Sequence, residues 1–207
     1  MTRQLNINLK GRIQKVKASD PLLPLFEAVT NSIQAIEELD QTDGKVLVEL
    51  VRGTENGSLK LEERNPIIGF VITDNGIGFN EANIQSFCTS DSQYKANKGA
   101  KGVGRFTWLK FFPKVEVNSH FCDADGTKKR RSFFFTFDGV EDELQENSSE
   151  KSNKTTVKMT DLKFEFKDKL SPDMDNVTNS LLEHFLSYFA TKSSPIITVK
   201  DGGEIRL

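Results

Sequence analysis

The sequence is poor in the residues that build metal centres and disulfide frameworks, and it lacks a long apolar run. It contains only two cysteines and two histidines in 207 residues. Cys88 and Cys122 are far apart and lie at no zinc-ligand spacing from a histidine, so we expect two reduced thiols. No apolar stretch reaches the roughly 18 residues of a membrane span, and the N-terminus has no apolar core of signal-peptide length. These absences predict a cytoplasmic location and no membrane partner.

The chain also lacks an excess of charge of either sign. The chain has 28 basic and 30 acidic residues and a net charge of -2, so it shows no electrostatic footprint for nucleic acid. Its apolar content of 36%, with 16 phenylalanines, is enough for a substantial core. We therefore expect residues 1–207 to form one domain, and the abrupt end at EIRL suggests the N-terminal part of a longer protein.

One long amphipathic helix is predicted near the N-terminus. Ser19, Asp20 and Pro21 form a helix-entry signal, because an acidic cap precedes a proline whose missing N–H costs nothing there. Apolar residues then recur at steps of three and four, which is the spacing of a buried helix face. The prediction is a helix over residues 21–39.

Strand-like patterns fill much of the remaining chain. The predicted strands cover residues 3–17 (a first strand or arm), 45–51, 67–73, 114–121, 129–137, 155–160 and 196–200. Helices are predicted to start near residue 103 and to span residues 175–190. The polar segment 86–101 is predicted to be a mobile loop, and residues 138–152 a surface connection.

Glu27 and Asn31 lie four residues apart on the first helix, so their side chains leave the same face. A carboxylate here could take a proton from an attacking water, and an amide oxygen one turn later could complete the oxygen shell of Mg²⁺. The alternative for this pair taken alone is a solvated polar edge.

A glycine-containing turn, DNGIG, follows the strand over residues 67–73. Gly76 and Gly78 would let the backbone approach a flat ligand closely. Asp74, at the strand end, could accept a hydrogen bond from an exocyclic amine, which would select adenine over guanine. Taken alone, the pattern fits a plain Asn-Gly turn equally well.

A second glycine pattern, GAKGVG, occupies residues 99–104 and leads into an apolar helix. Its amides and the helix N-terminus could cradle phosphates, and Lys101 and Arg105 would add positive charge. It is neither a Walker A loop nor a dinucleotide fingerprint. The candidate ligand-binding residues of this turn are Lys101, Gly102, Val103, Gly104 and Arg105.

The order of these motifs resembles the GHKL family of ATPases, which includes type II topoisomerase B subunits, the large heat-shock chaperones, mismatch-repair ATPases and sensor histidine kinases. The resemblance is carried by LFEAVTNSIQAIE, VITDNGIGF and KGAKGVGRFTWLKFF, with KTTVKMTDL similar to a later family strand. It covers residues 20–162. It implies an α+β two-layer sandwich, in which helices cover one face of a mixed, mostly antiparallel sheet.

The resemblance also implies roles for individual residues. Glu27 matches the water-activating base, and Asn31 matches the Mg²⁺ ligand. Asp74 matches the residue that binds the adenine amine, and Gly76 and Gly78 match the floor of that site.

Two further matches lie later in the chain. Gly102 and Gly104 match the phosphate-facing turn. Thr155 matches the threonine that supports a water network beside adenine, although Lys154 stands where the family usually has glycine.

The implied function is a Mg-dependent, ATP-binding and ATP-hydrolysing domain that acts as a conformational or dimerisation switch. The implied ligands are ATP, ADP and Mg²⁺, and the implied partners are a second copy on ATP binding and a C-terminal domain. No clearly placed cation follows Thr155 to meet the γ-phosphate, so we expect slow hydrolysis by this chain alone. The alternatives are a histidine kinase-type catalytic domain and a nucleotide-binding module without appreciable hydrolysis.

Other conspicuous residues have simpler interpretations. The phenylalanines at 133–135 are expected in a core strand, and the basic run 128–131 in a solvated turn. Trp108, Phe111 and Phe112 are expected to pack behind the phosphate turn.

Overall fold

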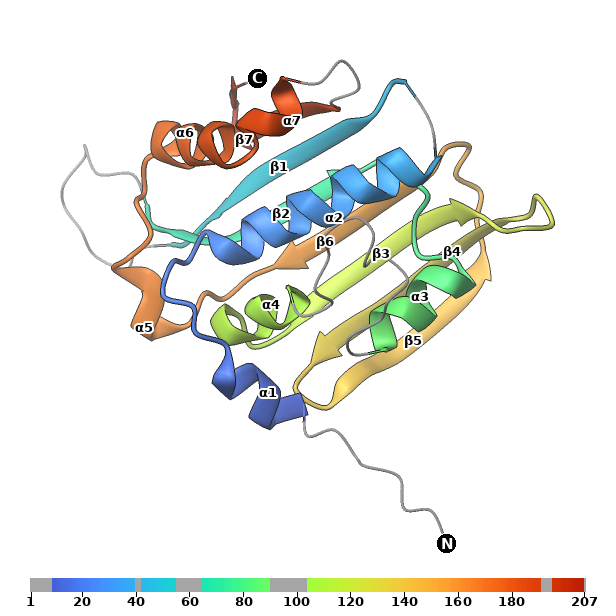
Figure 1. Cartoon of the computed structure of the whole chain (residues 1–207), viewed down its shortest axis with the longest axis horizontal. Helices are drawn as coiled ribbons and strands as arrows, with labels where there is room; N and C mark the ends of the chain where they lie inside the picture. The colour runs from blue at the N-terminus through green and yellow to red at the C-terminus, as the bar shows by residue number, and fades with distance from the viewer. Residues whose placement is uncertain (1–8, 40–41, 55–64, 90–103, 191–194, 207) are drawn as a thin grey trace, which may run out of the picture.

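The protein folds as a single sheet with helices packed on it (Figure 1). The computed structural model describes residues 9–39, 42–54, 65–89, 104–190 and 195–206. The strands are β1 Lys45–Arg52, β2 Ile67–Asp74, β3 Val115–Cys122, β4 Lys128–Thr136, β5 Gly139–Asn147, β6 Lys154–Met159, β7 Ile196–Asp201 and β8 Glu204–Arg206. The helices in these residues are α1 Leu9–Lys15, α2 Leu23–Leu39, α3 Glu81–Cys88, α4 Arg105–Phe111, α5 Phe164–Lys167, α6 Met174–His184 and α7 Leu186–Phe189.

The sheet is open, with eight strands in the order β5-β4-β3-β6-β2-β1-β7-β8. All neighbours pair antiparallel except β1 and β7, which pair parallel. The α+β class and the mixed, mostly antiparallel sheet predicted from the sequence are therefore confirmed.

One face of the sheet carries the core. Along the central strands, alternate residues are buried, as in Val46, Val48 and Leu50 of β1. Figure 1 shows α2, α4 and α6 lying in front of the sheet, with α2 crossing its middle. Alternation of this kind is expected when helices cover one face and the other face is left open.

Helix α2 forms where the apolar spacing predicted it. The Asp20 carboxylate accepts a hydrogen bond from the Leu22 N–H at 2.9 Å, which satisfies a donor at the helix entry. Leu25, Val29 and Ile33 are fully buried against the sheet. This helix carries Glu27 and Asn31, so its packing decides where they lie.

Helix α4 is fixed by buried aromatic residues and by hydrogen bonds at its C-terminal end. Trp108, Phe111 and Phe112 are buried, as expected for packing residues. The Lys163 ammonium donates to the carbonyl oxygens of Leu109 and Lys110 at 2.7 and 2.9 Å, which satisfies acceptors at the end of the helix. Burial lowers the pKa of Lys163 below its ordinary 10.5.

Three segments differ from the sequence prediction. The strand or arm predicted over 3–17 is wrong for residues 9–15, which form α1 and bury Ile13. The surface connection predicted over 138–152 contains β5, an exposed edge strand that pairs with β4 through its backbone. The loop predicted over 86–101 overlaps the end of α3, a helix that Asn80 caps by accepting the Asn83 N–H at 2.9 Å. Residues 90–101 of the predicted loop lie outside the described part of the chain.

Among the described residues, no helix combines the length and the apolar character needed to cross a bilayer.

Candidate functional site

Asp74 ties the end of β2 to α2 and to the glycine turn. Its side chain is buried, and Oδ2 accepts a hydrogen bond from the Ser32 hydroxyl at 2.9 Å. Oδ1 accepts from the backbone N–H of Gly76, also at 2.9 Å. Charge-assisted hydrogen bonds from two elements therefore fix the orientation of this carboxylate.

The glycine turn packs too closely on its neighbours to carry side chains. A Cβ at Gly76 would lie 2.6 Å from the carbonyl carbon of Ala35, and the N–H of Ile77 donates to the Ala35 oxygen at 2.9 Å. Gly78 has a φ of +78°, and a Cβ there would lie 2.8 Å from the Ser119 hydroxyl oxygen. Both positions require glycine for a physical reason.

A row of buried polar side chains crosses the sheet at the level of this turn. The strand register pairs Asp74 of β2 with Thr155 of β6, Thr155 with Ser119 of β3, and Ser119 with Arg131 of β4. Their exposed fractions are 5%, 4%, 0% and 1%. The Ser119 and Thr155 hydroxyl oxygens lie 2.8 Å apart. We call these four residues the polar row.

Sequence reasoning found two members of the polar row, Asp74 and Thr155, and missed the other two. The prediction that residues 128–131 form a solvated turn is wrong, because they belong to β4 and Arg131 is buried. A signal was present, since Arg131 shares the inward side of its strand with Phe133 and Phe135. A charged residue in an inward series of phenylalanines indicates a special role or a special partner.

Glu27 lies against the start of α4. A Cβ on Gly104 would clash with the Oε2 and Cδ atoms of Glu27. The structure therefore brings the predicted base and the last glycine of the second glycine pattern into direct contact. Burial raises the pKa of the Glu27 carboxyl above its ordinary 4.5, because a charged carboxylate is poorly solvated there.

Asn31 and Arg105 lie beside this contact. Asn31 is exposed and follows Glu27 by one turn of α2, on the same side of the helix. The Arg105 guanidinium donates to the Thr89 carbonyl oxygen at 3.1 Å and lies over the rings of Phe87 and Phe106. In this arrangement Arg105 braces α4 against the end of α3. The predicted residues Lys101, Gly102 and Val103 lie outside the described part of the chain.

The side chains around Asn31 suit a cation most of whose ligands come from water and from a bound phosphate. Within the described ranges, no group of three or more His, Cys, Asp or Glu residues is placed to hold a metal ion. Asn31 could offer one amide oxygen to Mg²⁺, and water and phosphate oxygens would supply the other ligands, which is the usual way that Mg²⁺ binds with a phosphorylated substrate. The residues present are compatible with that mode.

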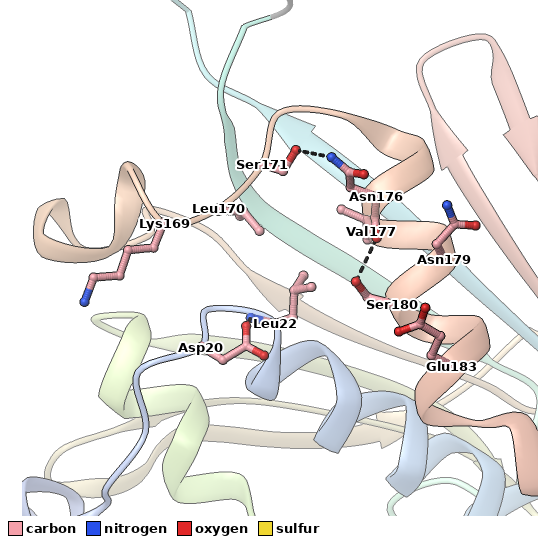
Figure 2. Close-up of a pocket in the computed structure, with 10 residues that line it drawn as sticks. All are labelled: Asp20, Leu22, Lys169, Leu170, Ser171, Asn176, Val177, Asn179, Ser180 and Glu183. Carbon is pink, nitrogen blue, oxygen red and sulfur yellow. Dashed lines mark hydrogen bonds between the residues drawn. The ribbon is translucent and has the colours of Figure 1, made fainter.

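A separate cavity of about 410 Å³ lies between the start of α2 and helix α6. Figure 2 shows Leu22 and Val177 among its apolar lining and Asp20 and Glu183 among its polar lining. Part of its polar wall is already internally bonded, since the Asn176 amide donates to the Ser171 hydroxyl at 2.8 Å. No residue of the motifs lines this cavity, so it is distinct from the candidate site.

Comparison of the sequence with models of known protein families finds no match, and no curated protein matches it.

Proposed function

We propose that this chain has the GHKL-type ATP-binding fold, binds Mg-ATP beside α2 and hydrolyses it. The observation that carries the proposal is the surrounding of Asp74, a buried carboxylate held by Ser32 and Gly76 at the floor of a glycine turn. Three of the predicted elements meet there, since α2, the end of β2 and β6 all contribute to this cluster.

Asp74 has the chemistry to recognise adenine. An ionised carboxylate offers about four acceptor positions, and the hydrogen bonds from Ser32 and Gly76 fix the orientation of the group. A carboxylate accepts from the exocyclic amine of adenine and is repelled by the carbonyl oxygen that guanine presents there. Glycine at 76 and 78 lets the turn pack directly on Ala35 and Ser119, which sets the position of the backbone beside Asp74.

Glu27 has the chemistry of a general base. Its pKa is raised by burial, and a base whose pKa lies closer to the working pH transfers protons more effectively. Glu27 contacts Gly104, the last residue of the glycine pattern proposed to receive the phosphates. Asn31 would hold Mg²⁺, which supplies charge neutralisation for the phosphate oxygens when bound.

Two observations separate this proposal from its alternatives. Among the GHKL proteins that this chain resembles, histidine kinases usually lack an acid at the position that matches Glu27. The presence of Glu27 therefore favours hydrolysis over phosphotransfer to histidine. A module that only binds nucleotide needs no desolvated carboxylate at the phosphate turn. ATP-driven pairing of two copies is part of the proposal and rests on the family resemblance alone.

Calorimetric titration with ATP, ADP and GTP, each with and without Mg²⁺, tests the binding step. We expect ATP and ADP to bind, and GTP to bind at least roughly tenfold more weakly, because its carbonyl would meet a carboxylate. Equal binding of ATP and GTP, or no binding of either, would refute the proposal. Asp138→Asn serves as a control, since its carboxylate is exposed and pairs with Lys10 at 3.1 Å.

A single-turnover assay tests the hydrolysis step. Slow release of phosphate that Glu27→Ala abolishes supports an ATPase, whereas tight ATP binding without phosphate release supports the binding module. Repeating the assay at several protein concentrations reveals pairing, because a rate per chain that rises with concentration requires a second copy.

A further inference from the structure

Arg131 is one of the largest fully buried side chains of the protein. Burial of a guanidinium is costly unless it is fully paired, so a strand that buries one needs a compensating arrangement. Arg131 lies at the end of the polar row that begins at Asp74. Its position links the candidate site to the exposed carboxylates of Glu81 and Glu143, with which it pairs.

The guanidinium joins three separate elements. The Nη1 group of Arg131 donates a hydrogen bond to the carbonyl oxygen of Phe79 at 2.8 Å. Nη2 donates to the Glu81 carboxylate of α3 at 2.8 Å and to the Gln145 amide oxygen of β5 at 2.5 Å. The Glu143 carboxylate lies 3.1 Å from Nε and provides a second negative charge.

The peptide groups that follow the glycine turn are held from three sides. The N–H of Phe79 donates to the Ser119 hydroxyl at 2.9 Å, while its carbonyl accepts from Arg131. The preceding carbonyl, that of Gly78, accepts from the Asn83 amide at 2.8 Å. Gly78 itself has a φ of +78°, which glycine adopts at no steric cost, so these hydrogen bonds fix where the turn lies rather than relieve strain.

The other end of the turn is fixed by different residues. Gly76 is bonded to Asp74, and Ile77 is bonded to the Ala35 carbonyl of α2. Loss of the Arg131 bond would leave the Phe79 end of the turn held by the hydrogen bonds of Ser119 and Asn83 alone, with the Phe79 carbonyl no longer tied to β4. We expect Gly78 and the floor beside Asp74 then to shift relative to the sheet.

We propose that Arg131 is a positioning residue of the nucleotide site: it fixes the turn from Gly78 to Phe79 against the sheet and thereby sets both the affinity and the base selectivity of the site. This inference rests on the proposed function. Arg131 touches no nucleotide in this scheme and acts through the backbone carbonyl of Phe79.

The next residue on the same strand supplies a matched control. Arg130 points to the opposite face, where it pairs with Glu146 at 2.7 Å and bonds Asn118 at 3.1 Å, and it is only half-buried. Arg131→Met and Arg130→Met remove the same groups from neighbouring positions. We expect Arg131→Met to weaken ATP binding by roughly tenfold or more and to reduce the preference for ATP over GTP, because small displacements of a preset site are costly. Arg130→Met should leave both unchanged.

Affinity and selectivity are measured on full-length chains by calorimetry, well below the melting temperature and after circular dichroism has confirmed folding. A purely structural role for Arg131 lowers the melting temperature without changing the ratio of ATP to GTP affinity in the folded protein. An unchanged affinity and ratio in folded Arg131→Met would therefore overturn the inference.

If Arg131→Met does not fold, Arg131→Lys decides. Lysine keeps the charge but lacks the planar fork that reaches Phe79, Glu81 and Gln145 together. We expect a several-fold loss of ATP affinity, and wild-type affinity and selectivity would overturn the inference. The proposed function fails separately, namely if the wild-type chain binds no adenine nucleotide; binding that Asp74→Asn abolishes but Arg131→Met and Arg131→Lys retain removes only the role of Arg131.

Discussion

Glu27 is a carboxylate on α2 and Asp74 a carboxylate packed against that helix, and their surroundings differ in kind. Asp74 is buried and receives hydrogen bonds from a hydroxyl and a backbone amide, and it starts a row of polar side chains across four strands. Glu27 is half-buried against the backbone of Gly104, and burial is the cause of its raised pKa. One carboxylate is oriented by donors and the other is perturbed by loss of water.

The difference separates two tasks within one site. A recognition group works best when its orientation is set before the ligand arrives, because less ordering is then needed on binding. A general base works best when its proton affinity is raised toward the working pH. The four predictions below test this division, beginning with the largest expected effect.

The first prediction concerns Glu27 and turnover. We expect Glu27→Ala to lower the single-turnover rate by roughly a hundredfold or more while ATP affinity is retained, because a base acts on the transition state. Glu37→Ala, at an exposed position on the same helix, is the control. Parallel loss of binding and turnover in Glu27→Ala would mean that both carboxylates serve recognition.

The second prediction concerns Asp74 and binding. We expect Asp74→Asn to weaken ATP binding by about 1.5–3 kcal/mol, because a charge-assisted acceptor is lost. Calorimetry at saturating Mg²⁺ measures this change. Ser32→Ala should give a smaller loss in the same direction, since Ser32 only orients the carboxylate. An Asp74→Asn variant with wild-type affinity would contradict the assignment.

The third prediction concerns the contact between Glu27 and Gly104. Gly104 has helical dihedrals, φ −57° and ψ −41°, so alanine would be favoured there by about 0.5–1 kcal/mol if nothing else were near. The added Cβ would displace the Glu27 carboxylate, and we expect Gly104→Ala to lower turnover by roughly tenfold. In the Glu27→Ala background the same change should raise the melting temperature and leave turnover unaffected. A loss of the same size in both backgrounds would show that the contact with Glu27 is not the cause.

The fourth and smallest prediction concerns pH. Because burial raises the pKa of Glu27 above 4.5, the folded chain keeps this proton at pH values where the unfolded chain has lost it. Between the two pKa values the folded state binds more protons, so its stability falls as pH rises through that window. Glu27→Gln should therefore match the wild type in free energy of unfolding below pH 4.5 and exceed it at higher pH, as urea titrations would measure. The acid limb of the turnover rate should also lie above pH 4.5, and a limb at or below that value would contradict the raised pKa.

Much of the fold was readable from local patterns, and the failures have physical causes. Helix α2 was predicted because its apolar spacing and entry residues agree. Strand β5 was missed because an edge strand with the sequence GVEDELQEN has no buried side to create alternation. Its stability comes from backbone pairing with β4, which a single-sequence pattern does not reveal.

The candidate site divides in the same way. Asp74, Gly76 and Gly78 were found because their spacing is local. Ser119 and Arg131 were missed because their relation to Asp74 is a strand register, which depends on how segments far apart in the sequence align.

The parallel pairing of β1 with β7 has a consequence for folding during translation. Arg52 of β1 pairs with Asp201 of β7 across 149 positions of sequence, whereas β2 follows β1 closely along the chain. During translation, β2 follows β1 closely and can pair with one edge of β1 early. The other edge of β1 stays unpaired until β7 has been synthesised, near the end of the domain. During that interval the free edge of β1, with its apolar sequence VLVELV, is a template for pairing with other nascent chains. Rapid elongation, or a chaperone that shields this edge, is expected to improve the yield of native protein.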